Sequence, residues 1–182
     1  FESETFIETA EVMLEFTSYI KKVTGFNAGV VNLGGGLGVR YLESDPIIDY
    51  REKIAEIGEA VKNTALRLGI NPPKILMEPG RSLVADAGMT LYTVGTIKKI
   101  PGYKNYVSID GGMTDNPRFA LYRSKYTVIA ANKANDKCDL ECSVVGRCCE
   151  SGDILQEGIP MPSDIKRGDL IACLTTGAYH FS

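Results

Sequence analysis

The chain has 182 residues, of which 44% are hydrophobic and 24% are charged, a composition that is ordinary for one or two globular domains. The net charge is −3 and no basic block is present, which argues against nucleic acid and anionic membranes as partners. No run of about 18 apolar residues occurs, so we expect no membrane span. We expect a cytoplasmic location with reduced thiols. Because the sequence opens inside a helical pattern without Met or a signal peptide, we also expect it to be a fragment of a longer protein.

The chain begins with a helical pattern followed by a strand pattern. Apolar residues recur at helical spacing over residues 5–22, and the pattern ends before Gly25. Residues 28–33 then form an apolar run that is interrupted only by Asn32. A run this short is typical of a strand that is covered on both faces.

A second helix and a second strand follow. Asp45 is a candidate N-cap and Pro46 a candidate first-turn residue, and apolar residues then keep the helical period until Gly69. Residues 74–77 form the next short apolar run. The order α-β-α-β predicts two parallel strands, whose carboxyl ends lie at the same edge of a sheet.

From about residue 87 the helical periodicity fades and short β-rich runs take over, separated by Gly, Pro, Asn and Asp. One helical turn is predicted at residues 117–122. The predicted strands are 89–100, 106–110, 126–130, 139–145 and 169–174. The predicted fold class is therefore an α/β part, residues 1–86, followed by a mostly antiparallel β domain, residues 87–182.

A glycine-rich turn, Gly-Gly-Gly-Leu-Gly at residues 34–38, follows the first predicted strand. Main-chain N–H groups in such a turn can point together at an anion, because no Cβ blocks its approach. The turn therefore indicates a phosphate site, and the alternative is simply a tight strand-to-helix connection. It is not the spaced G-x-G-x-x-G pattern, so a Rossmann dinucleotide site is not predicted.

Glu-Pro-Gly-Arg at residues 78–81 follows the second predicted strand. An ionised Glu78 only accepts hydrogen bonds, whereas Arg81 offers a fork of donors suited to phosphate or carboxylate. Pro79 keeps Glu78 out of helical geometry, and Gly80 allows close approach to the main chain. Taken alone, the motif is better explained as a strand-to-helix turn that carries a surface ion pair, and only its combination with the other motifs of the chain favours a binding site.

The five cysteines form no C-x-x-C pair and the single His is at position 180, so no metal site is expected. We interpret three of the cysteines as small buried hydrophobic residues: Cys138, Cys142 and Cys173. Cys148 and Cys149 are adjacent and are treated below.

In combination, the motifs resemble the diaminopimelate decarboxylases, pyridoxal-phosphate enzymes of the alanine-racemase-type fold (group IV decarboxylases). The matching segments cover nearly the whole chain in the same order: Gly-Gly-Gly-Leu-Gly at 34–38, Glu-Pro-Gly-Arg at 78–81, Asp-Gly-Gly-Met-Thr-Asp-Asn-Pro-Arg-Phe-Ala-Leu-Tyr at 110–122, Cys-Glu-Ser-Gly-Asp at 149–153 and Gly-Ala-Tyr at 177–179. The resemblance implies that residues 1–86 are the C-terminal portion of a pyridoxal-phosphate-binding β/α (TIM-like) barrel. It also implies decarboxylation of meso-2,6-diaminopimelate to L-lysine and CO₂, the last step of lysine biosynthesis.

The resemblance also implies a set of cofactor contacts. The glycine turn would bind the phosphate of pyridoxal 5'-phosphate, and Glu78 would pair with its pyridine nitrogen and keep that nitrogen protonated. Arg81 would reach a substrate carboxylate near the phosphate, and Tyr179 would contact the phosphate, although a core tyrosine is the alternative. The implied cofactor-binding residues are Gly35, Gly36, Glu78, Pro79, Gly80, Arg81 and Tyr179.

Substrate contacts follow in the same way. Arg118 and Tyr122 are four residues apart, on one side of a helical turn, and would hold the distal carboxylate of the substrate. Glu150 would accept from the distal ammonium. The alternative is a solvated Arg118 beside a half-buried Tyr122. The implied substrate-binding residues are Arg81, Arg118, Tyr122, Glu150 and Tyr179.

Cys149 is the residue that the resemblance implies as the catalytic proton donor to Cα. Cys148 precedes it, so which sulfur acts remains open. Family members are homodimers with shared active sites, in which Cys149 and Glu150 would come from the partner subunit, far from Gly36 of their own chain.

The lysine that forms the Schiff base would lie in a part of the barrel that this chain does not include, so the chain alone is expected to be inactive. Three alternatives stay open: a related decarboxylase of ornithine, arginine or carboxynorspermidine, a catalytically inactive regulator of the same fold, and an unrelated phosphosugar barrel enzyme.

Overall fold

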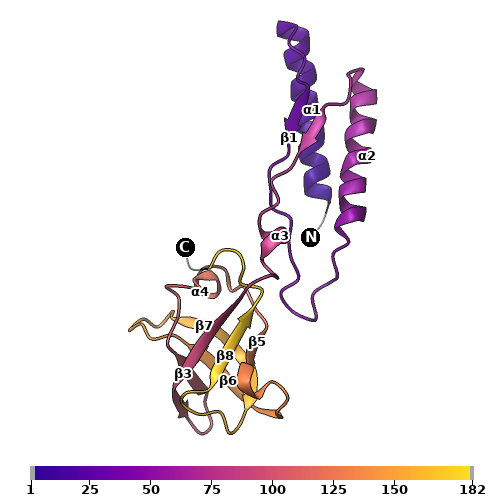
Figure 1. The fold of residues 1–182 in the computed structure, drawn as a ribbon. Coiled ribbons are helices and arrows are strands. Elements are labelled where there is room, and N and C mark those ends of the chain that lie inside the picture. The colour runs from indigo at the N-terminus through magenta and orange to yellow at the C-terminus, as the bar shows by residue number, and fades with distance from the viewer. Residues whose placement is uncertain (1–2, 181–182) are drawn as a thin grey trace. The chain divides into compact units, whose positions relative to one another are not determined.

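The computed structural model describes residues 3–180 and divides them into two compact units, which we describe separately (Figure 1). Unit 1 comprises residues 3–39 and 47–82, and unit 2 comprises residues 40–46 and 83–180. The division after residue 82 precedes the expected boundary at 86 by four residues. No helix within residues 3–180 is long and apolar enough to cross a membrane.

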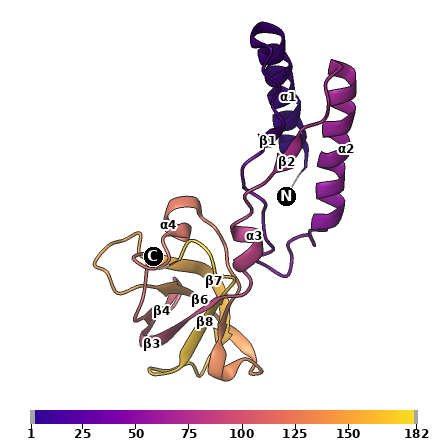
Figure 2. The same cartoon turned by 45° about the horizontal axis from the view of Figure 1, so that its top comes forward.

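Unit 1 has the predicted α-β-α-β order. Helix α1 (Glu4–Thr24) precedes strand β1 (Val30–Asn32), and helix α2 (Tyr50–Leu68) precedes strand β2 (Lys74–Leu76). The two strands are parallel and pair in register from Val30↔Lys74 to Asn32↔Leu76, as predicted. Figure 2 shows them side by side, with both helices beside them. The core joins α1, β1 and α2 through Phe6, Ala10, Leu14, Val31, Leu33, Leu37, Ile57, Val61 and Ala65.

The start of α2 differs from the prediction. Its N-cap is Asp49, whose side chain accepts from the main-chain N–H of Glu52 at 3.1 Å. Asp45 instead accepts from the N–H groups of Tyr41 and Leu42, at 3.0 and 2.8 Å, and so closes the preceding turn. Both aspartates are competent caps, and only the path of the chain decides which N–H groups each one meets.

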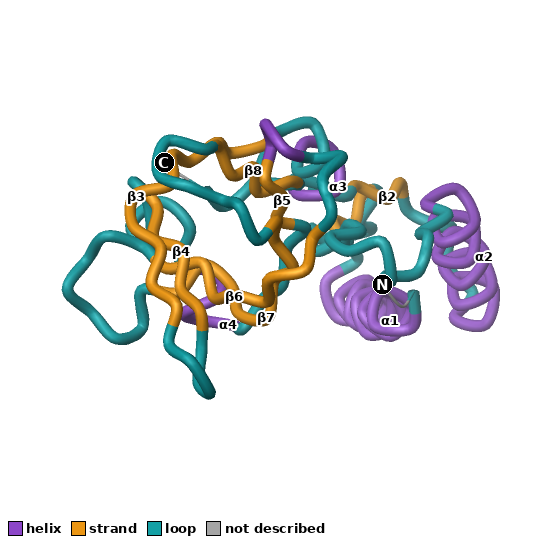
Figure 3. Tube along the Cα trace, turned by 90° about the horizontal axis from the view of Figure 1, so that it is seen from below, coloured by secondary structure: helices purple, strands orange, loops and turns teal. Residues whose placement is uncertain are grey.

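Unit 2 is a six-stranded sheet in the order β5-β8-β3-β4-β6-β7. All its pairings are antiparallel except β4 with β6, which confirms the mostly antiparallel prediction. Its elements are β3 (Met89–Lys99), β4 (Asn105–Ile109), α4 (Arg118–Tyr122), β5 (Val128–Ala130), the 3₁₀ turn η1 (Ala131–Lys133), β6 (Cys138–Val145), β7 (Ile154–Pro162) and β8 (Leu170–Leu174). Figure 3 shows the strands curving around one core. A short helix, α3 (Arg81–Val84), spans the division between the units.

Strand β7 was not predicted. Its sequence contains Gly158, at φ +66°, and two prolines, Pro160 and Pro162. Proline is tolerated in a sheet mainly at edges, because it has no N–H for the ladder. Strand β7 lies at one end of the strand order and pairs only with β6, so the sheet accepts residues that would disqualify a central strand.

The cysteine prediction is partly wrong. Cys142 and Cys173 are buried, and burial raises the pKa of Cys142 to about 11 and that of Cys173 to about 12. Cys138, however, is exposed. It opens β6, whose first residues are exposed while its later ones enter the core, so position along the strand overrides the preference of a thiol for the interior.

Candidate active site

The glycine turn (residues 34–38) and Glu78 are joined directly at one edge of the β1–β2 sheet. The N–H of Glu78 donates to the main-chain oxygen of Gly34 at 2.8 Å. The side chain of Asn32 connects the same two places, since its Nδ2 donates to Glu78 Oε1 at 2.6 Å and its Oδ1 accepts from Gly34 N at 2.8 Å. Two motifs more than 40 residues apart therefore meet where β1 and β2 end, as the parallel pattern predicts.

The main chain of the turn requires glycine at two positions. A Cβ on Gly35 would lie 2.4 Å from the main-chain oxygen of Glu78, so no larger residue fits without movement. Gly36 has φ +107°, a main-chain conformation that residues other than glycine rarely adopt. Both residues are exposed, so their main chain is open to a ligand. Exposed N–H groups and an adjacent carboxylate form a donor and acceptor set that fits a phosphorylated pyridine.

Asn32 is a site residue that sequence reasoning missed. Its only signal was that it is the one polar residue in the apolar run of residues 28–33. An amide side chain both donates and accepts, so it can bind a carboxylate and an N–H at the same time. Its contacts fix Glu78 relative to the glycine turn.

In unit 2, three tyrosines surround the guanidinium of Arg118. Its Cζ lies 5.5 Å from the ring centroid of Tyr179, 5.6 Å from that of Tyr122 and 6.0 Å from that of Tyr41, all within cation–π range. Its Nη2 donates to Ser124 Oγ at 3.3 Å. Three of the five predicted substrate residues, Arg118, Tyr122 and Tyr179, thus lie together. Tyr41 also contacts Arg118, which the sequence did not indicate.

Beside this cluster is a set of buried polar atoms. The rings of Tyr41 and Tyr126 meet edge to face at 4.8 Å, and those of Tyr126 and His180 at 5.2 Å. Within residues 3–180, the hydroxyls of both tyrosines, His180 Nε2 and Arg118 Nε are buried without a hydrogen-bond partner. Burial lowers the pKa of His180, an effect that Arg118 reinforces, and burial raises the pKa of Tyr126. Within residues 3–180 no carboxylate lies within 4.0 Å of the guanidinium, whose charge is met only by aromatic rings and the Ser124 hydroxyl, and this arrangement favours an anionic ligand.

The predicted Cys149 and Glu150 lie in a turn of unit 2 that we call the cysteine turn (residues 146–153). Both side chains are exposed, and Glu150 Oε1 accepts from the N–H of Gly152 at 3.2 Å and from Ser151 Oγ at 3.1 Å. Cys148 is half-buried, and burial together with the neighbouring Asp153 carboxylate raises its pKa. The exposed sulfur of Cys149 is therefore the better placed of the two for a ligand outside this turn.

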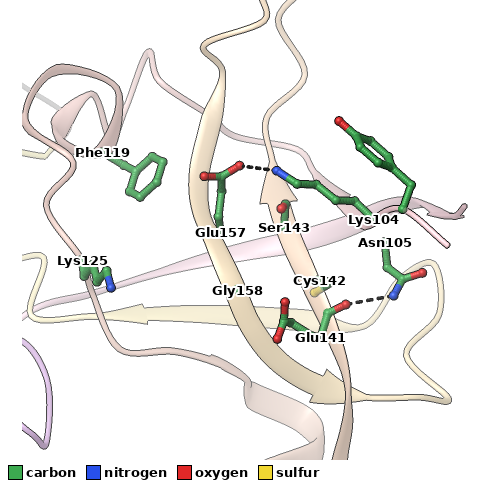
Figure 4. Close-up of a pocket in the computed structure, with 10 residues that line it drawn as sticks. Lys104, Asn105, Phe119, Lys125, Glu141, Cys142, Ser143, Glu157 and Gly158 are labelled. Carbon is green, nitrogen blue, oxygen red and sulfur yellow. Dashed lines mark hydrogen bonds and ion pairs between the residues drawn. The ribbon is translucent and has the colours of Figure 1, made fainter.

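Two of the cavities in unit 2 are lined by both Lys104 and Glu157. A cavity of about 540 Å³ is bordered by β6 and β7 and crossed by the ion pair of Lys104 and Glu157, 2.9 Å apart (Figure 4). None of the predicted site residues lines it. A second cavity, of about 340 Å³, shares Lys104 and Glu157 and is lined by Cys148 and Glu150. The cysteine turn therefore borders a concave surface of its own.

The predicted residues are divided between the units. The glycine turn and residues 78–81 belong to unit 1, and Arg118, Tyr122, Tyr179 and the cysteine turn belong to unit 2. That Cys149 and Glu150 act on a partner subunit's site stays a prediction.

Comparison with known proteins identifies the class. A family model described as "Pyridoxal-dependent decarboxylase, C-terminal sheet domain" matches residues 16–177. The chain therefore belongs to the pyridoxal-dependent decarboxylases.

Within this class, the chain is similar to diaminopimelate decarboxylases. The chain is 47% identical over 180 residues to the diaminopimelate decarboxylase of Staphylococcus aureus (strain COL), covering 99% of this chain and 42% of that protein. It is 47% identical over 182 residues to the diaminopimelate decarboxylase of Bacillus subtilis (strain 168), covering 100% and 41%. A crystal structure of diaminopimelate decarboxylase from M. jannaschii in co-complex with L-lysine superposes with a TM-score of 0.83 at 34% identity, covering 98% of this chain and 40% of that one. The chain thus spans about two fifths of the length of these relatives.

Proposed function

We propose that the protein containing this chain decarboxylates meso-2,6-diaminopimelate to L-lysine and CO₂ with pyridoxal 5'-phosphate. The observation that carries the proposal is the joined arrangement of the glycine turn, Asn32 and Glu78 at one sheet edge. The 47% identity to diaminopimelate decarboxylases supports the choice of substrate.

The cofactor would be held mainly by unit 1. Main-chain N–H groups of Gly35 and Gly36 would bind the phosphate, with Arg81 and Tyr179 near it. Glu78, oriented by Asn32, would hold a proton on the pyridine nitrogen. When bound, pyridoxal phosphate supplies a cationic ring that accepts the electron pair left on carbon as CO₂ departs. Pro79 and Gly80 shape the turn that presents Glu78.

The substrate would be recognised at its non-reacting end by Arg118. The guanidinium has five N–H donors and gives one of them to Ser124 Oγ at 3.3 Å, so it retains donors for a carboxylate. Pairing of guanidinium with carboxylate is charge-assisted and reads a planar anion specifically. Tyr122 would line the same end.

The cysteine turn would complete a partner subunit's site in a homodimer. Cys149 would deliver a proton to Cα after CO₂ has left, and Glu150 would accept from the distal ammonium of the substrate. The exposure of both side chains supports this role, since each is open to a second molecule.

Two alternatives make different predictions about the site residues. Ornithine and arginine carry a cation at the distal end, which a guanidinium in neutral surroundings would repel. A catalytically inactive regulator would need neither Cys149 nor a carboxylate at position 78.

Turnover of the whole cofactor-loaded protein is the deciding test. CO₂ release and lysine formation are measured with meso-diaminopimelate, ornithine and arginine at matched concentrations. We expect lysine from meso-diaminopimelate and at most trace activity on the other two. Preference for ornithine or arginine would reject the substrate assignment, and absence of CO₂ with all three would favour the inactive regulator.

A further inference from the structure

A single buried carboxylate joins two loops of unit 2. Asp153 is 3% exposed, and its Oδ1 accepts from the N–H of Met113 at 2.7 Å. Its Oδ2 accepts from the N–H of Cys148, also at 2.7 Å. Met113 lies in the loop of residues 110–116, which leads into α4, and Cys148 lies in the cysteine turn. One side chain thus satisfies a main-chain donor from each loop.

The packing around this carboxylate leaves room only for glycine. A Cβ on Gly112 would lie 2.5 Å from Asp153 Oδ1, and a Cβ on Gly146 would lie 2.2 Å from either carboxylate oxygen. The oxygens of Asp153 therefore occupy the space that side chains at both positions would need. Such close approach of two main chains to one acid indicates a fixed position for Asp153.

Main-chain hydrogen bonds reinforce the same junction. Gly146 N donates to Asp153 O at 2.8 Å and closes the base of the cysteine turn, and Asp153 N donates to Glu150 O at 3.1 Å. Arg147 N donates to Gly111 O at 3.2 Å and adds a second link between the loops.

The loop of residues 110–116 is anchored in turn to β3. Asp115 Oδ2 accepts from the hydroxyl of Tyr92 at 2.7 Å, and Asp115 Oδ1 accepts from Gly112 N at 3.0 Å. The cysteine turn is therefore tied through Asp153 to a loop that is itself fixed on the sheet.

We propose that Asp153 is a positioning residue that sets the conformation of the cysteine turn and thereby the places of Cys149 and Glu150. It does so by binding the main chains of two loops with one buried carboxylate. The role assigned to Cys149 and Glu150 rests on the proposed function, whereas the positioning itself does not.

Asp153→Asn is the variant that separates this role from simple packing. The amide has the shape of the carboxylate, but its NH₂ group cannot accept, so one of the two N–H donors loses its partner. Asp169→Asn is the matched control, because Asp169 is also 3% exposed and its carboxylate also binds a main-chain N–H, that of Lys166 at 2.9 Å. The side chain of Asp169 accepts hydrogen bonds from Asn132 and Lys166, neither of which is a predicted site residue.

The two variants are compared in the whole cofactor-loaded protein. We expect Asp153→Asn to lower kcat/KM for meso-diaminopimelate about 100-fold, the scale of loss for a misplaced catalytic group, and Asp169→Asn to leave it nearly unchanged. The cofactor absorbance should be the same in both. If both variants change kcat/KM by the same factor, Asp153 has no positioning role beyond that of any buried aspartate, and the proposal is overturned.

Thiol labelling tests the positioning without any turnover. Iodoacetamide modification of Cys148 is quantified by peptide mass spectrometry relative to the exposed Cys138 of the same chain. We expect the ratio to rise about threefold or more in Asp153→Asn, because Cys148 loses both its burial and the adjacent negative charge, and to stay constant in Asp169→Asn. A constant ratio in both variants would overturn the proposal, even if the protein acts on another substrate.

Hydrogen exchange of the unmodified protein decides the matter if Asp153→Asn does not fold. The N–H groups of Cys148 and Met113 should exchange much more slowly than that of Cys149, because a buried acceptor protects them. Exchange of Cys148 as fast as that of Cys149 would show that the carboxylate does not hold the turn.

Discussion

Gly35 is the position where one methyl group tests the proposed cofactor site most directly. Its Cβ would lie 2.4 Å from the main-chain oxygen of Glu78, whereas real Cβ atoms essentially never approach a neighbour below 3.0 Å. Gly35→Ala must therefore separate the glycine turn from Glu78 by at least about 0.6 Å. Because Glu78 N is bound to Gly34 O at 2.8 Å, the two segments cannot part without straining that bond.

Misplacement on this scale should affect both binding and turnover. A displacement approaching 1 Å costs about 100-fold in rate, and loss of one or two hydrogen bonds weakens cofactor binding about tenfold or more. Cofactor affinity is measured by titrating the apoprotein with pyridoxal phosphate and following visible absorbance, and kcat by lysine formation.

Gly58→Ala is the matched control in the same unit. Gly58 lies inside α2, and its added Cβ would meet nothing within 4 Å. This change should stabilise unit 1 by about 0.5–1 kcal/mol, because alanine loses less entropy in a helix, and leave cofactor affinity and kcat unaltered. If Gly35→Ala binds the cofactor as tightly as Gly58→Ala and turns over at the same rate, the cradle assignment is wrong.

Three further changes test the remaining roles. Glu78→Gln should lower kcat about 100-fold with little loss of cofactor, because the charge stabilising the protonated ring is gone, and an unchanged kcat would remove Glu78 from this role. Arg118→Ala should raise KM for meso-diaminopimelate about 30-fold or more, since a charge-assisted pairing is lost, and an unaltered KM would place the carboxylate elsewhere. Cys149→Ala should lower kcat about 100-fold or more while Cys148→Ala has little effect, and the reverse result would assign the proton to Cys148.

The surroundings of Arg118 set the direction of its binding preference. Four buried polar atoms of Tyr41, Tyr126, His180 and Arg118 lack partners within residues 3–180, and burial lowers the pKa of the His180 imidazole and raises that of the Tyr126 phenol, which favours the neutral form of each. Within residues 3–180, no carboxylate oxygen lies within 4.0 Å of the guanidinium of Arg118. An incoming carboxylate would therefore meet an uncompensated cation rather than displace an existing partner.

Local pattern was sufficient for most elements of the fold. Three patterns predicted them: the 3.6-residue period over the first helix, the short apolar runs that became β1 and β2, and the β-rich runs of the second half. Each pattern arises because side chains are buried at a fixed spacing, and that spacing can be seen in the order of the residues. The same holds for the two motifs after β1 and β2, since parallel strands bring their carboxyl ends to one edge.

Other features depended on residues that meet only after folding. The sequence pattern predicted Asp45 as the cap of α2, whereas the chain path gives that role to Asp49 and leaves Asp45 to close the preceding turn. Strand β7 became possible because it lies at the end of the strand order, and sheets tolerate proline mainly in edge strands.

The amino-acid sequence by itself determined the class of the protein and the residue types available to its site, because apolar spacing and motif chemistry are local properties. Only the tertiary structure decided that Asn32 links the glycine turn to Glu78, that Tyr41 reaches Arg118, and that Asp153 joins the cysteine turn to the loop before α4. Each of these contacts joins segments separated by many residues. A hydrogen bond or ring contact of this kind depends on distance in space, and the position of a residue along the chain does not give that distance.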